Sequence, residues 1–346
     1  MKNHSKLSYQ GQRIELKATD VSALLIKILQ RSGCPTPTAQ STAEHLIDTS
    51  LCGIESHGIM RVLQYVEQIK TGYLNSSGIP QIKTSSTGAC IVDGDAGLGI
   101  PAMELAYNKG IELTEESGIS ALAIRNVGHT GRHGSYADYA ANRGFLTICV
   151  GGGNRKIWRQ VAPHGGAKAM LPTNPWCIGI PGGNQGPVIL DFATSKIAGG
   201  LIYAAQSAGA QLPEDCLIDK HGRPTTDPND YFAGGAILPA GGHKGYGLAL
   251  VGELIGEAML GPATTECHWL LITLATQKFR EAGALQTAAE EVLLELRECP
   301  PAEGFDHVEI PGERERKHKE ASNGIIRIPE KTWGEILALA AELNIK

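Results

Sequence analysis

The stretch GIESHGIMRVLQYV, residues 53–66, pairs the pattern of an amphipathic helix with chemically active side chains. Ser56 is a residue type that commonly caps a helix N-terminus, so it predicts a helix that starts there. Successive helical residues turn by about 100°, which places His57 and Arg61 on one polar face. We therefore expect a helix that packs on a core and presents this face outward. The apolar residues of the opposite face are Ile59, Val62, Leu63, Val66 and Ile69.

His57 and Arg61 would be neighbours one helical turn apart on that polar face. A histidine can exchange a proton near neutral pH, and an arginine can hold a carboxylate through two parallel hydrogen bonds. Together the pair can hold and protonate a small 2-oxo acid. The alternative is that the polar face simply meets solvent.

The segments before this stretch also contain helix signals, so the first 70 residues are expected to form a small helical layer. Residues 1–17 are polar and are expected to be loosely held. A helix capped by Thr19 or Asp20 is followed by a second helix over about 38–52. The composition shifts to Ser, Gly and Pro at 76–80, which predicts a domain boundary before the first strand.

The next segment contains a glycine pattern found in dinucleotide-binding turns. A strand at 89–92 is followed by GLGIPA at 97–102 and by a helix over 101–116. The strand after that helix, 119–124, is not followed by a carboxylate for a ribose hydroxyl, and Pro101 stands inside the turn. We therefore interpret the glycines as a tight entry to a helix that begins with proline, rather than as a Rossmann phosphate loop.

A glycine-rich loop, GHTGRHGSY at 128–136, leads into a helix over 136–142. His129 follows a strand in this loop, a placement typical of catalytic side chains. His129 and His133 also have the spacing of a zinc pair, although the glutamate of the HExxH pattern is missing. The loop therefore predicts an acid–base histidine, with a zinc site as the alternative.

Three further segments have features of ligand binding. The hydrophobic strand at 145–150 runs into 151–154, whose glycines allow backbone amides to approach a ligand. The segment 191–196 places an acid before hydroxyl side chains and a helix start, which suits an anionic or ribose-bearing ligand. Lys244 stands near the start of a long helix, where its charge opposes the helix dipole, so binding of a phosphate or carboxylate explains it better than stability. The apolar residues on one face of that helix are Leu248, Val251, Ile255, Ala258 and Met259.

Length and composition limit the class of protein. A chain of 346 residues exceeds the usual size of one hydrophobic core, so two domains, or one domain with a large insertion, are expected. The net charge of -5, without a basic stripe, argues against nucleic acid as a partner. The eight cysteines include no CxxC pair, and the sequence shows neither a secretory leader nor a run of about 18 apolar residues. We therefore expect a cytoplasmic protein without a membrane span.

Several short segments, taken jointly, form an ordered set of motifs. They are Ser56-His57-Gly58 with Arg61, Gly128-His129, Thr173-Asn174-Pro175, Asp191-Phe-Ala-Thr194, Pro224-Thr-Thr-Asp-Pro228, His243-Lys244-Gly245-Tyr246-Gly247 and Pro311-Gly312-Glu313. Together they resemble the malate/L-lactate dehydrogenase family of the non-Rossmann type. The resemblance implies a homodimeric NAD- or NADP-dependent oxidoreductase that acts on a small carboxylate substrate. It also implies an α/β (α+β) fold, with the cofactor on a largely antiparallel sheet domain and helices from both chain ends forming the other domain.

The resemblance assigns roles residue by residue. His57 matches the histidine assigned as proton donor in some members, and His129 matches the acid or base of others, so both are retained. Arg61 matches a ligand of the substrate carboxylate. The other expected substrate contacts are Ser56, Asn154 and Asn174, and the expected cofactor contacts are Gly153, Asp191, Phe192, Ala193, Thr194, Lys244 and His268.

The chain departs from the family's pattern at 261–276, where the family usually has a longer loop and some members carry a second substrate arginine. In this segment His268 is interpreted either as a cofactor contact or as a histidine buried in the core. The expected domains are 1–80, helical; 81–262, cofactor-binding; and 263–346, packing on the first.

The reaction that these residues imply is reversible hydride transfer between a nicotinamide and C2 of a small 2-oxo or 2-hydroxy acid. Arg61 would hold the carboxylate, and His57 or His129 would handle the proton. The alternatives are reduction of a cyclic or N-alkyl imine beside a carboxylate, a zinc hydrolase built on His129 and His133, and a non-catalytic binding module.

Overall fold

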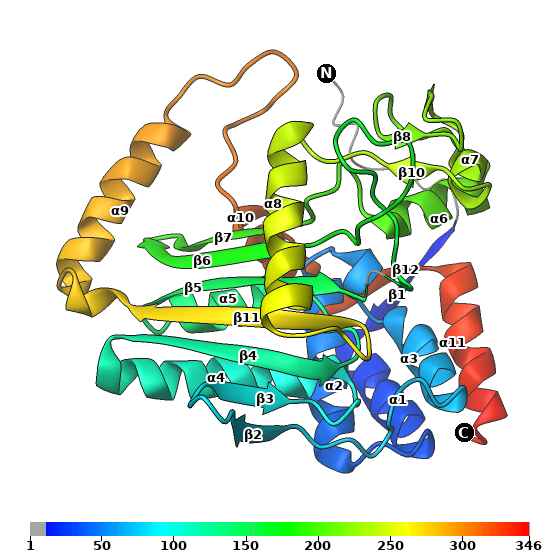
Figure 1. Ribbon diagram of the computed structural model, residues 1–346, viewed down its shortest axis with the longest axis horizontal. Coiled ribbons are helices and arrows are strands. Elements are labelled where there is room, and N and C mark those ends of the chain that lie inside the picture. The colour runs from blue at the N-terminus through cyan, green and yellow to red at the C-terminus, as the bar shows by residue number, and fades with distance from the viewer. Residues whose placement is uncertain (1–11, 155, 346) are drawn as a thin grey trace.

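Residues 12–154 and 156–345 are described by the computed structural model in Figure 1. Its centre is a seven-stranded sheet of order β2-β3-β4-β11-β5-β6-β7. Every neighbouring pair is antiparallel except the parallel pair β3 and β4. The expected largely antiparallel sheet is therefore confirmed, and a parallel Rossmann sheet is excluded. The strands are β2 (Gln81–Thr84), β3 (Cys90–Asp93), β4 (Ile119–Val127), β5 (Phe145–Gly153), β6 (Trp176–Gly183), β7 (Gly186–Phe192) and β11 (Cys267–Ala275).

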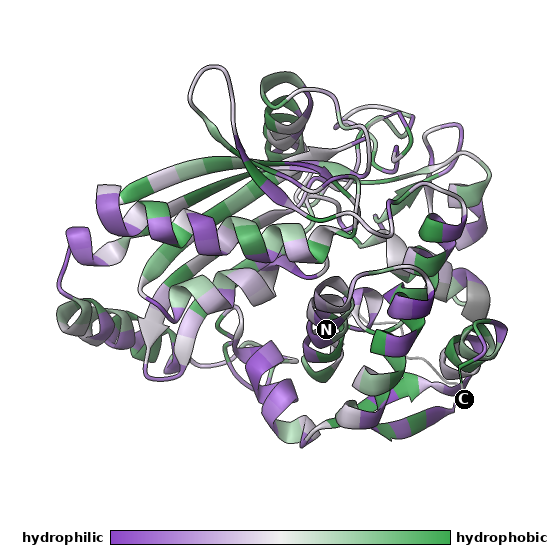
Figure 2. Ribbon diagram, turned by 90° about the horizontal axis from the view of Figure 1, so that it is seen from below, coloured by the Kyte–Doolittle hydropathy of each residue, from purple (hydrophilic) through white to green (hydrophobic). Residues whose placement is uncertain are grey.

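Helices cover both faces of this sheet (Figure 1). On one face, α4 (Gly99–Ser117) and α5 (His133–Ala141) pack against the apolar side chains of β4, β5 and β11. On the other face, α8 (His243–Glu253) and the π-helical turn η2 (Leu254–Met259) lie against β5. At the outer end of the sheet, α9 (Ala282–Arg297) packs against β6. The strands are mostly green in Figure 2, as expected for a sheet buried between helices.

Helices from both chain ends share one hydrophobic core, as the resemblance implies. The strand β1 (Arg13–Lys17) pairs with β12 (Ile325–Pro329) beside this core. The expectation that residues 1–17 are loosely held is therefore wrong for β1, because pairing with a C-terminal strand satisfies its backbone; residues 1–11 lie outside the described residues. The helices of this core are α1 (Ala18–Arg31), α2 (Thr36–Leu51), α3 (Arg61–Lys70) and α11 (Glu330–Glu342).

The remaining elements form a small three-stranded sheet, of order β10-β8-β9, and the helices near it. The helix α10 (Glu313–Ser322) is strongly hydrophilic, purple in Figure 2, and contacts α2. Among the residues that the structure describes, no helix combines the length and apolar character needed to cross a bilayer. The other elements are β8 (Leu217–Ile218), β9 (Pro224–Thr225), β10 (Ala236–Ile237), α6 (Gly199–Ala208), α7 (Pro228–Phe232) and the single turn η3 (Thr276–Lys278).

The predicted helix start at Ser56 is wrong. The chain forms only a 3-10 turn there, η1 (Glu55–His57), and α3 begins later. The break lies at Gly58, whose backbone is extended and where a Cβ would lie 2.2 Å from the Ser50 hydroxyl oxygen of α2. Close packing against α2 therefore interrupts the helix. The predicted apolar face is nevertheless buried at Ile59, Val62 and Val66.

The glycines at 97–102 serve close packing. Gly99 starts α4, and a Cβ added there would lie 2.4 Å from the backbone oxygen of Gly128. The interpretation of these glycines as a tight helix entry is thus confirmed, although the helix begins before Pro101 rather than at it. Because Gly99 has no side chain, α4 can pack directly against the loop that carries His129.

One expectation fails in the C-terminal half. The segment from residue 263 does not pack only on the N-terminal helices, because β11 lies between β4 and β5 in the sheet. The large apolar residues of α8 are partly exposed: Leu248 and Val251 are 36% and 47% exposed. The buried side of α8 and η2 carries small residues instead, and a Cβ at Gly256 would lie 2.4 Å from the backbone nitrogen of Gly152.

Candidate active site

A cavity of about 1290 Å³ lies between the helical layer and the sheet. Its walls come from η1, α3, the loop after β4, the end of β7, and the starts of α6 and α10. Sites for drug-sized ligands commonly measure ~300–1000 Å³, so this cavity has room for a small acid beside a larger ligand. The residues expected from the sequence that line it are Ser56, His57, Arg61, His129, Gly153, Asn174, Asp191, Phe192 and Ala193.

The Nδ1 atom of His129 is fixed as a hydrogen-bond acceptor. The Tyr65 hydroxyl lies 2.8 Å from this atom, and the Gly131 backbone N–H donates to it at 3.3 Å. A backbone N–H can only donate, so Nδ1 carries no proton, and the neutral ring carries its proton on Nε2. Because Tyr65 is fully buried, this tautomer is held from inside α3. His129 therefore offers a donor at Nε2.

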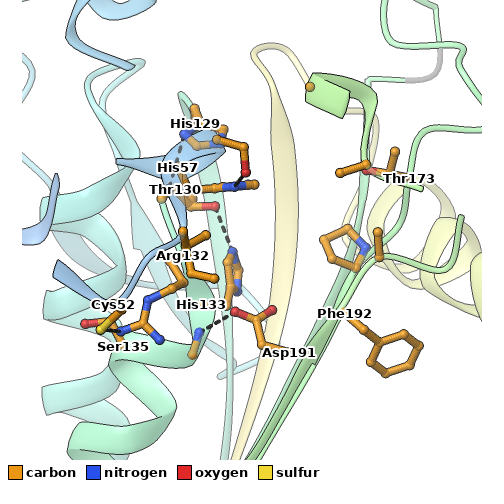
Figure 3. A pocket seen from close by; sticks show the side chains of 18 of the residues that line it. Cys52, His57, His129, Thr130, Arg132, His133, Ser135, Thr173, Asp191 and Phe192 are labelled. Atoms are coloured by element: carbon orange, nitrogen blue, oxygen red, sulfur yellow. Dashed lines mark hydrogen bonds between the residues drawn. The ribbon is translucent and has the colours of Figure 1, made fainter. Parts of the chain in front are cut away.

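His57 stands beside His129, with ring centroids 5.3 Å apart (Figure 3). Its Nδ1 lies 2.9 Å from the Ser56 hydroxyl oxygen. Burial, together with the positive charge of Arg61, lowers the pKa of His57 to about 3 and the pKa of His129 well below its ordinary value. Both imidazoles are therefore neutral near pH 7.

Arg61 is oriented by its own helix and the turn before it. Its Nε donates to the Ser56 carbonyl oxygen at 2.6 Å, and its Nη1 donates to Gln64 Oε1. These bonds fix the plane of the guanidinium while using only part of its set of N–H donors. Arg61 can therefore present donors to a carboxylate in the cavity.

His133 makes a different set of contacts from His129. Its Nε2 lies 2.8 Å from the Thr130 hydroxyl, and its ring packs on Trp269, with centroids 4.2 Å apart. In the described part of the chain, no group of three or more His, Cys, Asp or Glu side chains is arranged to hold a metal ion. The zinc-pair alternative therefore has no set of ligands among these residues.

Asp191 and Phe192 point to opposite sides at the end of β7 (Figure 3). Asp191 Oδ2 accepts from the Gly134 backbone N–H at 2.6 Å, so the carboxylate stabilises the start of α5. Burial raises the pKa of Asp191, against the lowering effects of this N–H and of the Arg132 charge. Asp191 thus holds α5 and the histidine loop against β7 while it borders the cavity.

Four of the expected site residues do not line the cavity. Thr194 is buried, and its hydroxyl donates to a backbone carbonyl. His268 is a core histidine on β11, with Nδ1 2.9 Å from a backbone carbonyl oxygen. Asn154 donates to a backbone carbonyl in the loop before β11, and Lys244 is exposed at the start of α8. By contrast, Asn174 borders the cavity, but its amide nitrogen is engaged by a buried glutamate of α8.

The cavity also contains residues to which the sequence pattern assigns no role. Gln64 and Gln68 share the polar side of α3 with Arg61, so their spacing was a usable signal. Arg132, which pairs with Asp48 at 3.0 Å, and Glu266 had no such local signal. They reach the cavity only because of how the loop and β11 are placed in the fold.

Two neutral imidazoles beside an arginine, in a cavity with room for a second ligand, suit proton transfer to a small substrate that carries a carboxylate. The chain belongs to the malate/L-lactate dehydrogenase family, whose sequence profile matches residues 16–337. It is therefore an oxidoreductase that acts on 2-hydroxy acids.

Relatives with assigned activities agree on the chemistry and differ in the substrate. The chain is 33% identical over 342 residues to an L-sulfolactate dehydrogenase of Methanocaldococcus jannaschii, covering 95% of this chain and 97% of that protein. A solved structure of sulfolactate dehydrogenase from the same organism superposes with a TM-score of 0.85 at 32% identity, covering 96% of this chain and 98% of that one. A Δ1-pyrroline-2-carboxylate/Δ1-piperideine-2-carboxylate reductase of Pseudomonas putida is 33% identical over 248 residues, 72% of each chain.

Proposed function

We propose that the protein catalyses reversible hydride transfer between NAD or NADP and C2 of a small 2-hydroxy or 2-oxo acid. The observation that supports this most strongly is that Arg61, His57 and His129 line one cavity from three different segments. Arg61 binds the substrate carboxylate through paired N–H donors. His129 hydrogen-bonds the C2 oxygen through its Nε2–H, and the proton that this oxygen takes up comes from the imidazole pair of His129 and His57, which gains one proton when the acid binds.

The rest of the cavity wall fits a dinucleotide. Gly199 and Gly200 at the start of α6 line the cavity, and the first amides of a helix favour phosphate groups. Phe192, Tyr203 and Tyr231 add aromatic surface on which flat rings can stack. When bound there, the cofactor supplies or accepts the hydride, while these residues hold it beside the acid.

Binding of the acid changes the charge around the imidazoles. In this structure the positive charge of Arg61 lowers the pKa of both His57 and His129. A carboxylate bound to Arg61 offsets that charge, so a proton on an imidazole becomes less unfavourable. We expect the protein to take up a proton together with a 2-oxo acid, close to where the alkoxide develops. General acid help of this kind is typically worth ~10²- to 10⁴-fold in rate.

The test is steady-state oxidation of NADH and NADPH with a panel of 2-oxo acids. His129→Ala should lower kcat by ~10²-fold or more, because the donor to the C2 oxygen is lost. If the parent oxidises neither cofactor with any acid, the proposed reaction is wrong. If His129→Ala turns over like the parent, the reaction stands but the assignment of the proton donor does not.

A second candidate reaction is reduction of a cyclic or N-alkyl imine beside a carboxylate. The Pseudomonas putida relative is named as a reductase of two cyclic imine carboxylates. A C=N bond at the same carbon needs the same arginine and the same hydride. Pyruvate with methylamine, compared with pyruvate alone, separates the two reactions: turnover that depends on methylamine favours the imine.

We also propose that the protein is a homodimer formed through the exposed apolar face of α8 and η2. Exposed apolar patches of this kind commonly mark protein interfaces. Leu254→Glu should convert the dimer to monomer in size-exclusion chromatography with light scattering. Val292→Glu, on α9, changes another exposed apolar residue and serves as the control. A Leu254→Glu protein with the parent's mass would rule out this interface. The exposed residues of the face are Leu248, Leu250, Val251, Leu254 and Met259.

The proposed compartment is the cytoplasm. The eight cysteines form no disulfide in the described residues, as is usual under reducing conditions. Mass measurement of thiol-alkylated protein from cell extract tests this, because disulfides formed in the cell would leave some cysteines unlabelled.

A further inference from the structure

Glu266 is an acidic side chain in the cavity that the proposed reaction does not use. It precedes β11, and its backbone is fixed from both sides: its N–H donates to the Val127 carbonyl oxygen at 3.2 Å, and its own carbonyl accepts from the Asn154 N–H at 2.8 Å. The side chain lines the cavity together with Arg61 and His129. The fold therefore places a carboxyl group where a small acid would bind.

The Glu266 carboxyl group is not neutralised by a direct contact with Arg61. Arg61 is held by the Ser56 carbonyl and by Gln64 instead. Within residues 12–154 and 156–345, Arg61 and Glu266 form no ion pair. Arg61 therefore keeps donors for a substrate carboxylate, and Glu266 keeps an acceptor for another part of the ligand.

Two acceptor atoms at this end of the cavity lack a donor. Among the described residues, Glu266 Oε2 and Gln68 Oε1 are both out of contact with solvent and have no hydrogen-bond partner. Buried acceptors without partners are costly, and a ligand that brings an N–H or O–H group removes that cost. A ligand that brings a second carboxylate adds only more acceptors and a repulsive charge.

We propose that Glu266 determines the substrate class: it excludes 2-oxo acids with a second anionic group and favours those whose far end donates a hydrogen bond or carries positive charge. This inference rests on the proposed function, because it takes Arg61 as the ligand of the first carboxylate. Specificity of this type arises from unpaired or repelling groups left by the wrong substrate.

The protonation state of Glu266 adds a pH dependence. Burial raises the pKa of Glu266 to about 7, although the Arg61 charge and the nearby Gln68 side chain and His129 backbone lower it. The other titratable groups that interact with it are Tyr65, Tyr73 and Cys267, which are neutral near pH 7 because burial raises the pKa of each. Exclusion of a second anion should therefore be strong above pH 7 and weaken below it.

The experiment compares two probes that differ in one group. Oxamate and oxalate have nearly the same size and shape, but oxamate has an amide where oxalate has its second carboxylate. Calorimetric titration at about pH 8, with NADH and then NADPH present, should show oxamate binding at least about tenfold more tightly than oxalate. Glu266→Gln should shrink this ratio at least about tenfold, because the repelling charge is gone while the size is kept.

Two controls separate the possible outcomes. Glu295→Gln removes the same charge from the exposed side of α9 and should leave the ratio as in the parent. Lowering the pH from about 8 to about 6 should tighten the binding of oxalate relative to that of oxamate in the parent, but not in Glu266→Gln. A ratio that Glu266→Gln leaves unchanged overturns this inference and leaves the proposed function standing. Binding of neither probe to the parent would count against the proposed function, and this inference would fall with it.

Discussion

The helices α3 and α8 place their large apolar side chains in opposite ways. In α3 the large apolar side chains are buried, and the polar side carries Arg61 into the cavity. In α8 the large apolar side chains are exposed, and glycines and an alanine pack on β5. Periodicity therefore tells which residues share a face, but the partner element decides which face is buried.

The largest expected effect is on the polar face of α3. Arg61→Ala should lower kcat/KM for pyruvate by ~10³-fold, because a carboxylate loses a charged, paired donor in a desolvated site. Glu67→Ala changes an exposed residue of the same helix and should stay within about twofold of the parent. Steady-state kinetics of both variants measure the difference. Equal losses in the two would mean that α3 contributes stability, not substrate binding.

The small-residue face of α8 and η2 should be sensitive to a single methyl group. Gly256→Ala, in η2, places a Cβ 2.4 Å from the Gly152 backbone nitrogen, so we expect a loss of ~1–3 kcal/mol in the free energy of unfolding. Gly247→Ala, on the open side of α8, meets nothing within 4 Å and should be neutral or slightly stabilising. Urea unfolding of both variants tests this. A larger loss for Gly247→Ala would reverse the assignment of the buried face.

Acid should lower the free energy of unfolding, because His45 of α2 is buried as a neutral hydrogen-bond acceptor. Its Nε2 accepts from the Arg132 backbone N–H at 2.9 Å, and burial lowers the pKa of His45 to about 3. The unfolded chain, with an ordinary histidine pKa near 6.5, binds more protons in the window between these values, so stability falls as pH falls. His45 should contribute roughly 1.5 kcal/mol of this loss between pH 6.5 and 5.

The variant His45→Gln keeps an acceptor at this position and cannot be protonated. The free energy of unfolding, measured at several pH values, should fall less steeply with acid than in the parent. An unchanged slope would show that His45 is not the group responsible.

The smallest expected effect concerns the buried hydroxyl that orients His129. Tyr65→Phe removes the donor to Nδ1 but keeps the ring in the core, so kcat should fall by ~10-fold with little change in KM. The pH profile of kcat should shift as well, because the tautomer of His129 is no longer held from α3. A variant that only loses stability, with the parent's kcat and pH profile, would show that Tyr65 is structural.

The site shows how far local sequence patterns reach. His57, Arg61 and His129 each stand next to a helix or strand signal, and the fold brings all three to one cavity. Thr194 and Lys244 also stand at predicted helix starts, and His268 lies in the segment that departs from the family's pattern, yet none of these three lines the cavity. Glu266 carried no local signal, since its role depends on where β11 enters the sheet.

The sequence by itself determined the helices of the first seventy residues, the main strands, the histidine loop and the family. It did so because hydrophobic period, glycine and proline are local properties of the chain. Only the tertiary structure decided that β11 enters the centre of the sheet, that α8 and η2 pack small residues on β5, that Tyr65 reaches His129, and that Glu266 lines the same cavity. Those outcomes depend on contacts between residues far apart in the chain, where close packing and buried hydrogen bonds outweigh local preference.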